Sequence, residues 1–172
     1  GSRSARWHSA RGLPPPSRVL VADDSMKADT AWHYACEGTA LLWRGDFQNA
    51  RQMLAAMARR SDRSLAQRAG KGKNAPDPAG AGPFNRYRMA QAQRARVLGM
   101  LLVPYNEDFS VALTRAPDVR EACGEAWQAD SRGSGHIVTS LRELLGIIGA
   151  HEWRRRGVEI AALDARIHPW YG

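Results

Sequence analysis

The chain has 172 residues and a formal net charge of +8, and 44% of its residues are hydrophobic, enough for one globular domain with its own core. No apolar run approaches the roughly 18 residues that span a bilayer, and the N-terminus lacks a signal-peptide core, which argues against a membrane protein and predicts a cytoplasmic one. Cys36 and Cys123 stand outside any CxxC or Cys/His cluster, which argues against a zinc module and predicts two buried thiols. Leu and Ala outnumber β-branched residues, a balance that favours helix over sheet.

Residues 1–28 are predicted to form a disordered tail. Gly1 and Ser2 are typical of the remnant that a protease leaves when it removes a tag. The rest of the stretch combines scattered arginines with three consecutive prolines at 14–16 and shows no hydrophobic periodicity. The folded domain is therefore expected to occupy residues 29–172.

Two helices joined by a short turn are predicted at the start of this domain. The first runs from about residue 29 to Arg44, and Gly45 ends it. Asp46 can cap the second helix. Apolar residues recur at helical spacing along that second helix: Phe47, Ala50, Leu54 and Met57. The two helices are expected to pack as an antiparallel pair.

A flexible loop is predicted over residues 61–83, because four glycines and three prolines fall within 70–83. A third helix is expected to follow, from Phe84 past Leu98. It carries four arginines in two neighbouring rows, which form the candidate basic surface of the chain: Arg86, Arg88, Arg94 and Arg96. The alternative interpretation is an ordinary solvated helix face.

The C-terminal half is predicted to add two helices and a short extended segment. Residues 100–103 and 111–113 fit a short β-hairpin, and a helix follows Pro117. The strongest helical pattern covers residues 137–156. Its apolar stripe consists of Ile137, Leu141, Leu144, Leu145 and Ile148. The fold expected from all these elements is mainly α, a compact bundle of about five helices with room for one short β-hairpin.

Motifs for catalysis or cofactor binding are missing from the sequence. It contains no GxGxxG after a strand, no GxxxxGK[ST] and no GxSxG. His151 and Glu152 begin an HExxH pattern, but Arg155 stands where the second histidine would be. No catalytic, cofactor-binding or metal-binding residue is therefore assigned to this chain.

Five runs within residues 30–172 resemble the N-terminal region of bacterial class I methyltransferases that use S-adenosylmethionine. They are GTALLWRGDFQNARQ (38–52), QAQRARVLGM (91–100), SLRELLG (140–146), GAHEWR (149–154) and RIHPWYG (166–172). In that family a helical N-terminal region precedes a Rossmann-like catalytic domain, whose Gly-rich loop binds the cofactor. The resemblance implies that this chain is truncated before the catalytic domain. It also implies that the parent protein, and not this chain, binds S-adenosylmethionine.

The sequence supports two alternative hypotheses about function. The first is an accessory or substrate-recognition domain of such a methyltransferase, not catalytic alone, whose partner is the C-terminal catalytic domain of the same polypeptide. The second is a stand-alone basic helical module that binds nucleic acid or an acidic protein, which the net charge and the third helix favour. A reading frame that continues past Gly172 into a strand and a Gly-rich turn would support the first.

Overall fold

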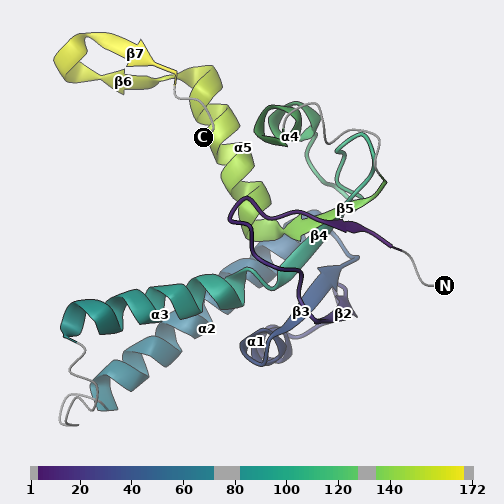
Figure 1. Ribbon diagram of the computed structural model, residues 1–172, viewed down its shortest axis with the longest axis vertical. Helices are drawn as coiled ribbons and strands as arrows, with labels where there is room; N and C mark the ends of the chain where they lie inside the picture. The colour runs from purple at the N-terminus through teal and green to yellow at the C-terminus, as the bar shows by residue number, and fades with distance from the viewer. Residues whose placement is uncertain (1–3, 72–81, 128–134, 169–172) are drawn as a thin grey trace.

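The computed structural model describes residues 4–71, 82–127 and 135–168 and has a mixed α/β architecture (Figure 1). The main sheet has the strand order β1-β5-β4-β3-β2, in which β4 and β5 are antiparallel and the other neighbours are parallel. Its strands are β1 (Arg6–Trp7), β2 (Arg18–Ala22), β3 (Thr39–Trp43), β4 (Leu101–Tyr105) and β5 (Ile137–Ser140). The helices of the described residues are α1 (Ala28–Cys36), α2 (Phe47–Lys71), α3 (Pro83–Leu98), α4 (Arg120–Trp127) and α5 (Leu141–Arg156).

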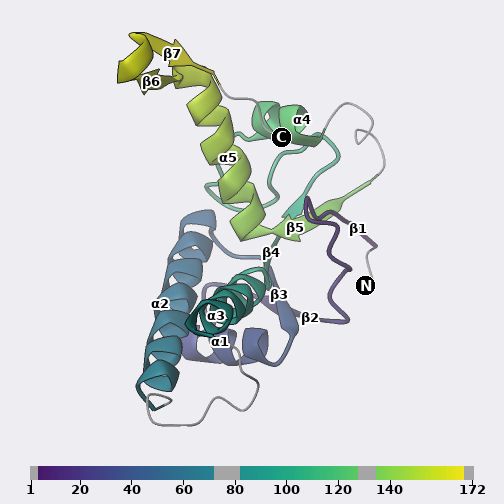
Figure 2. The same cartoon turned by 60° about the vertical axis from the view of Figure 1, so that its left-hand side comes forward.

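A small arm extends from the far end of α5, away from the sheet (Figures 1 and 2). It consists of the antiparallel strands β6 (Val158–Ile160) and β7 (Ala165–Ile167), joined by a short 3-10 helix, η3 (Ala161–Leu163). Gly157 separates α5 from this arm with a backbone φ of 71°, a conformation that favours glycine.

The hydrophobic core lies between the helices and one face of the sheet. Alternate strand residues point into it, as the burial of Leu41 and Trp43 on β3 and of Leu101 and Val103 on β4 shows. The helices supply the other half of the core, from Ala31 and Ala35 on α1, Ala50, Met53 and Met57 on α2, Val97 and Leu98 on α3, Cys123 and Trp127 on α4, and Leu141, Leu144 and Ile147 on α5. No described helix combines the length and the apolar composition that a membrane span requires.

The prediction of a mainly α bundle is wrong, because the core is built on a five-stranded sheet. Gly38, at a φ of 82°, follows the end of α1, so residues 39–43 form strand β3 instead of the last turns of a helix. The stretch 1–28, expected to be a tail, contributes β1 and β2.

The loop expected over residues 61–83 also differs from the structure in its first part. Helix α2 continues to Lys71, because residues 61–71 contain good helix formers such as Leu, Ala, Gln and Arg even though their apolar periodicity is weak. The rest of that loop, at 72–81, and the pair Gly1 and Ser2 lie outside the described residues.

The burial predicted for the apolar stripe is confirmed for Ile137, Leu141 and Leu144, whereas Leu145 and Ile148 are half-buried. The Ser140 side chain accepts a hydrogen bond from the Glu143 amide and caps α5, while Leu141 and Leu144 are fully buried. Ile137 is buried as well, although it belongs to β5 and not to the helix. The predicted extended segment is present as β4, whose Tyr105 forms an isolated antiparallel bridge with Val111.

Asp46 connects three parts of the chain at the start of α2. Its Oδ1 atom accepts hydrogen bonds from the amides of Gln48 (2.8 Å) and Asn49 (3.2 Å), as an N-cap residue does. Its Oδ2 atom accepts one from Arg115 Nε at 2.6 Å, and its own amide donates to both carboxylate oxygens of Asp24. The Arg115 hydrogen bond, together with the two backbone amides, lowers the pKa of Asp46.

We expect an Asp46→Asn variant to be less stable than the parent at pH 7, with the difference disappearing in acid. Asparagine can still cap the helix, but it loses the charge that Arg115 stabilises. Because the folded-state pKa of Asp46 is lowered, its stabilisation is complete above the unfolded pKa of about 3.9 and is lost as the pH falls below that value. Urea midpoints at pH 7 and near pH 2 measure both effects. If the difference in stability between variant and parent stayed constant across this pH range, packing and not charge would be its cause.

Candidate functional site

Helices α2 and α3 form a hairpin that projects from the sheet, with the two helices side by side (Figures 1 and 2). The base of the hairpin belongs to the core, through Met53 and Met57 on α2 and Val97 and Leu98 on α3. Toward the tip, most of the described residues of both helices are exposed. The hairpin therefore combines a fixed base with a largely exposed far end.

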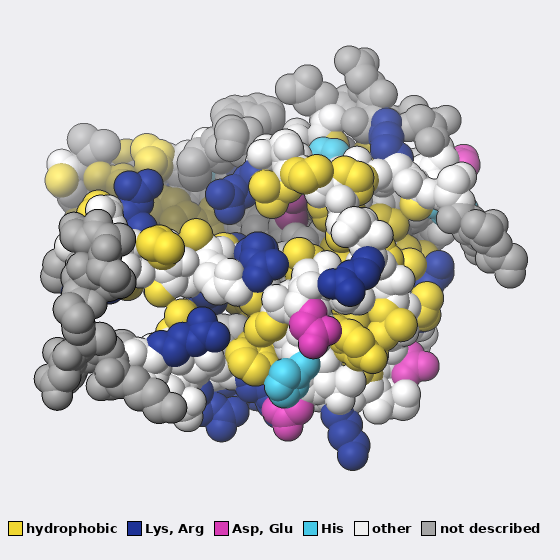
Figure 3. Space-filling view, turned by 60° about the horizontal axis from the view of Figure 1, so that its bottom comes forward, with side chains coloured by type: hydrophobic (Ala, Val, Ile, Leu, Met, Phe, Trp, Pro, Cys, Tyr) yellow, Lys and Arg dark blue, Asp and Glu magenta, His cyan; other side chains and the backbone are white. Residues whose placement is uncertain are grey.

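The positive charge of the chain is concentrated on this α2–α3 hairpin. The two helices contain nine arginines and one acidic residue, Asp62. With Lys71 the two helices hold 10 of the 25 basic residues and one of the 17 acidic residues of the chain, so the 15 basic and 16 acidic residues elsewhere nearly balance one another. In Figure 3 Lys and Arg side chains are spread along the hairpin face, and the Asp and Glu side chains in view lie farther from its tip. The field of this protein is therefore that of a neutral body with one cationic projection.

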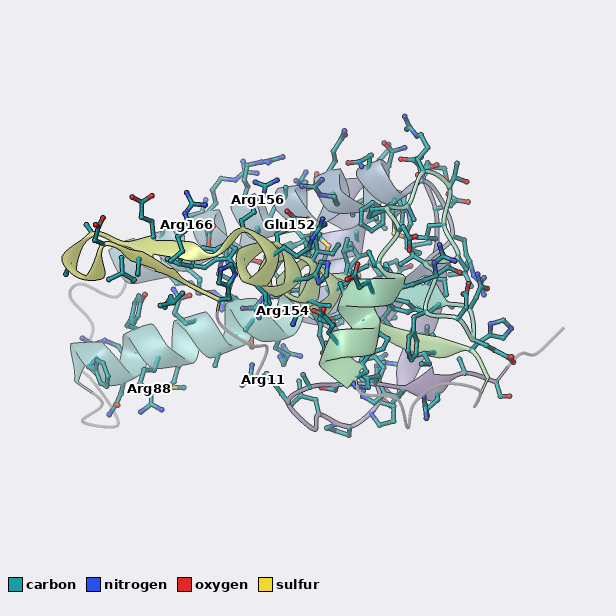
Figure 4. All side chains as sticks on the ribbon, turned by 90° about the horizontal axis from the view of Figure 1, so that it is seen from above. Arg11, Arg88, Glu152, Arg154, Arg156 and Arg166 are labelled. Atoms are coloured by element: carbon teal, nitrogen blue, oxygen red, sulfur yellow. The ribbon has the colours of Figure 1, made fainter. Side chains whose placement is uncertain are left out.

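The four arginines predicted as a basic surface have different surroundings in the structure. Arg94 is half-buried, and its Nε atom lies 2.6 Å from Oδ1 of Asp62 on α2. Arg96 donates to the Gln93 side chain and, at 3.4 Å, to the backbone oxygen of Cys36 at the end of α1. Arg86 and Arg88 are exposed on the first turns of α3, and Figure 4 shows Arg88 on that helix. Arg94 and Arg96 therefore hold α3 in place, whereas the other two face solvent.

The arginines of α2 were not predicted from the sequence to belong to a basic surface. Four of them are exposed, and no described carboxylate lies within ion-pair distance of their guanidinium groups: Arg51, Arg59, Arg63 and Arg68. The spacings of eight and four residues from Arg51 to Arg59 and Arg63 keep these three on one side of the helix. Together with Arg88, they make the unneutralised part of the hairpin, which we call the arginine face: Arg51, Arg59, Arg63, Arg68 and Arg88.

One ion pair fixes the hairpin to α1, and a second joins its two helices. Arg60 of α2 binds Asp29 of α1, and the hydrogen bond and charge of Arg60 lower the pKa of that carboxyl group. Arg94 lowers the pKa of Asp62 in the same way. These two pairs use the half-buried arginines, so the arginine face keeps its charge available for a ligand.

The last turn of α5 and the C-terminal arm carry arginines too, and glutamates neutralise three of them. Arg154 binds Glu125 of α4, Arg156 lies 3.2 Å from Glu152 and Arg166 lies 3.7 Å from Glu159. Figure 4 shows Arg156 and Arg166 on the same side of the arm as Glu152. Because each of these guanidinium groups has a carboxylate partner within the chain, the arm is a weaker candidate for an anion site than the hairpin.

A small cavity of about 110 Å³ lies where β3 and β4 end. Its polar lining comes from Arg44, Asn106 and His136. Strand ends of this kind often form ligand sites in α/β proteins. Pockets that enclose a nucleotide-sized ligand measure roughly 300–1,000 Å³. This cavity is therefore too small to enclose S-adenosylmethionine.

Two histidine–carboxylate pairs that the sequence did not reveal join separate elements. His8 Nδ1 lies 3.0 Å from Glu143 Oε1 and ties the segment after β1 to α5. His151 Nδ1 lies 2.9 Å from Glu125 Oε2 and ties α5 to α4. Among the described residues, three or more His, Cys, Asp or Glu side chains do not gather as a metal site would require. Through these pairs α5 is joined both to the segment after β1 and to α4.

The arginine face can bind a polyanion through several separate cationic contacts, because its guanidinium groups are exposed and spread along two helices. Comparison with known proteins finds no family model, curated protein or solved structure that matches the chain.

Proposed function

We propose that this chain is a nucleic-acid-recognition domain that positions a substrate for a neighbouring catalytic domain. The observation that carries the proposal is the concentration of charge on the α2–α3 hairpin, nine arginines against one acidic residue. A series of exposed guanidinium groups along a helix pair suits the phosphates of a nucleic-acid backbone, which supply most of the affinity of such complexes. A cytoplasmic location belongs to the same proposal.

The neighbouring catalytic domain, in this proposal, is an S-adenosylmethionine-dependent methyltransferase domain of the same polypeptide. The support for this part is the resemblance of the five sequence runs. The cofactor would be held by that domain. The residues of the arginine face would contribute to binding and orientation of the substrate, and none of them to methyl transfer.

Binding of a fluorescently labelled oligonucleotide of about 20 residues, followed by anisotropy between about 50 and 200 mM salt, tests the proposal. We expect the logarithm of the association constant to fall linearly with the logarithm of the salt concentration. An Arg59→Gln/Arg63→Gln variant removes two cationic contacts. The slope of this negative line should therefore become shallower by about 1.4–1.8, at 0.7–0.9 for each contact.

The matched control is Arg142→Gln/Arg155→Gln, which removes the same charge from exposed positions on α5. This variant should keep the slope of the parent protein. No saturable binding by the parent, or an equal loss of slope in both double variants, would contradict the proposal. The second outcome would show that only the net charge of the chain matters.

A further inference from the structure

The first turns of α3 expose large apolar side chains on the most basic part of the molecule. Phe84, Tyr87 and Met89 have exposed fractions of 70%, 63% and 69%. The helix contributes to the core only near its other end, at Val97 and Leu98. Burial therefore does not account for two aromatic rings at these positions, since aromatic rings are usually at least partly buried.

The aromatic rings share their side of the helix with an arginine. Phe84 and Tyr87 are three residues apart and Phe84 and Arg88 four apart, so the three side chains are neighbours on the helix surface. The guanidinium carbon of Arg88 lies 5.9 Å from the centre of the Phe84 ring, a cation–π distance. Helix α3 contains no acidic residue, so the surroundings of the two rings are cationic along the whole helix.

We propose that Phe84 and Tyr87 stack on unpaired bases, and that the nucleic acid this domain recognises is single-stranded at the hairpin. The inference rests on the proposed function and names its substrate class. Proteins that bind single strands combine a cationic track for the phosphates with exposed aromatic rings on which bases stack. A duplex keeps the faces of its bases stacked inside the helix and offers only their edges to a protein. Two exposed rings beside an arginine can therefore stack on the bases of a single strand but not on those of a duplex.

An apolar protein surface is a less suitable occupant of this face. Protein interfaces also contain aromatic residues and arginine, but their apolar cores are poor in charged groups. Here the rings lie on a helix with four arginines, next to a helix with five more, and Asp62 is the sole acidic residue of the two helices. Charge complementarity thus selects a polyanion that has flat aromatic groups of its own, which describes an unpaired nucleic-acid strand.

The test compares a 12-nucleotide single strand with a blunt duplex of the same sequence. A Phe84→Leu/Tyr87→Leu variant keeps apolar side chains on the helix and removes only the aromatic rings. We expect its affinity for the single strand to fall at least about tenfold, since stacking on each base contributes that order of binding. Its affinity for the duplex should stay within about twofold of the parent. Met89→Leu, which changes an equally exposed residue without a ring, should leave both affinities unchanged.

The outcomes separate this inference from the proposed function. The inference is overturned, and the proposed function survives, if the Leu double variant binds the single strand as well as the parent does; the rings then serve contact with a protein. Equal losses for single strand and duplex would overturn it as well, and the far-ultraviolet circular dichroism would show whether α3 has lost helicity. A parent protein that binds neither ligand would refute the proposed function and the inference with it.

Discussion

Truncation of Leu144 to alanine is expected to lower the free energy of unfolding by about 2–5 kcal/mol. Leu144 is fully buried on α5, within the core that joins the helices to the sheet. The loss combines the transfer free energy of the removed methyl groups with the cost of the cavity they leave. Urea denaturation followed by circular dichroism measures it as a decrease in the midpoint.

The control for this variant is Arg142→Ala on the same helix. Arg142 is exposed, and substitutions at such positions change stability by at most about 0.5 kcal/mol. A Leu144→Ala midpoint equal to that of the parent, or a larger effect from Arg142→Ala, would mean that the buried face of α5 is assigned incorrectly.

Replacing Trp43 with alanine should be at least as damaging, with a loss of about 3–5 kcal/mol. Trp43 ends strand β3, is 1% exposed and donates a hydrogen bond of 3.0 Å from its Nε1 atom to the backbone oxygen of Asp46. The substitution removes a tryptophan side chain from the core together with the hydrogen bond that its Nε1 atom donates. The Asp46 carbonyl keeps the bond that it accepts from the Ala50 amide, so the cavity accounts for most of the loss. Denaturant melts in urea determine the size of the loss.

Trp153 provides a matched control, because it undergoes the same substitution at a site that is 62% exposed on α5. Trp153→Ala should change the free energy of unfolding by about 0.5 kcal/mol or less in this chain. If the two tryptophan variants unfolded at the same urea concentration, the packing of Trp43 between sheet and helices would be refuted.

The amphipathic helices could be predicted from the sequence, whereas most of the strands could not. Residues 39–43 do not show the alternation of polar and apolar residues that indicates a strand, because Ala40 and Leu41 on opposite faces of β3 are both fully buried. The run at 18–22 is rich in β-branched residues, but on its own it is only a short apolar segment near prolines. What makes it a strand is pairing with β3, from Arg18 with Thr39 to Ala22 with Trp43. Such pairing depends on residues distant in sequence, which local patterns do not report.

The candidate site was predictable in part, for a similar reason. Arginine spacing on α3 located one side of the hairpin, but it did not reveal that Asp62 holds Arg94. That contact depends on α2 and α3 lying side by side. The exposed arginines of α2 were visible in the sequence as the polar side of an amphipathic helix. Arg63 and Arg68 were assigned to the loop predicted over residues 61–83, whereas Arg51 and Arg59 lay in the predicted helix but were not joined with them into one surface.

The position of β1 determines the order in which this chain can fold. Its residues pair with β5, Arg6 with Ile137 and Trp7 with Val138, whereas β2 pairs with β3 only about twenty residues further along. On a ribosome, β1 is the first strand made and its partner is the last strand of the sheet. The loop to be closed is correspondingly long, and its entropy opposes pairing until the rest of the core has formed. We therefore expect β2, β3 and β4 to assemble with their helices first and β1 to dock last, when α5 brings Glu143 within reach of His8.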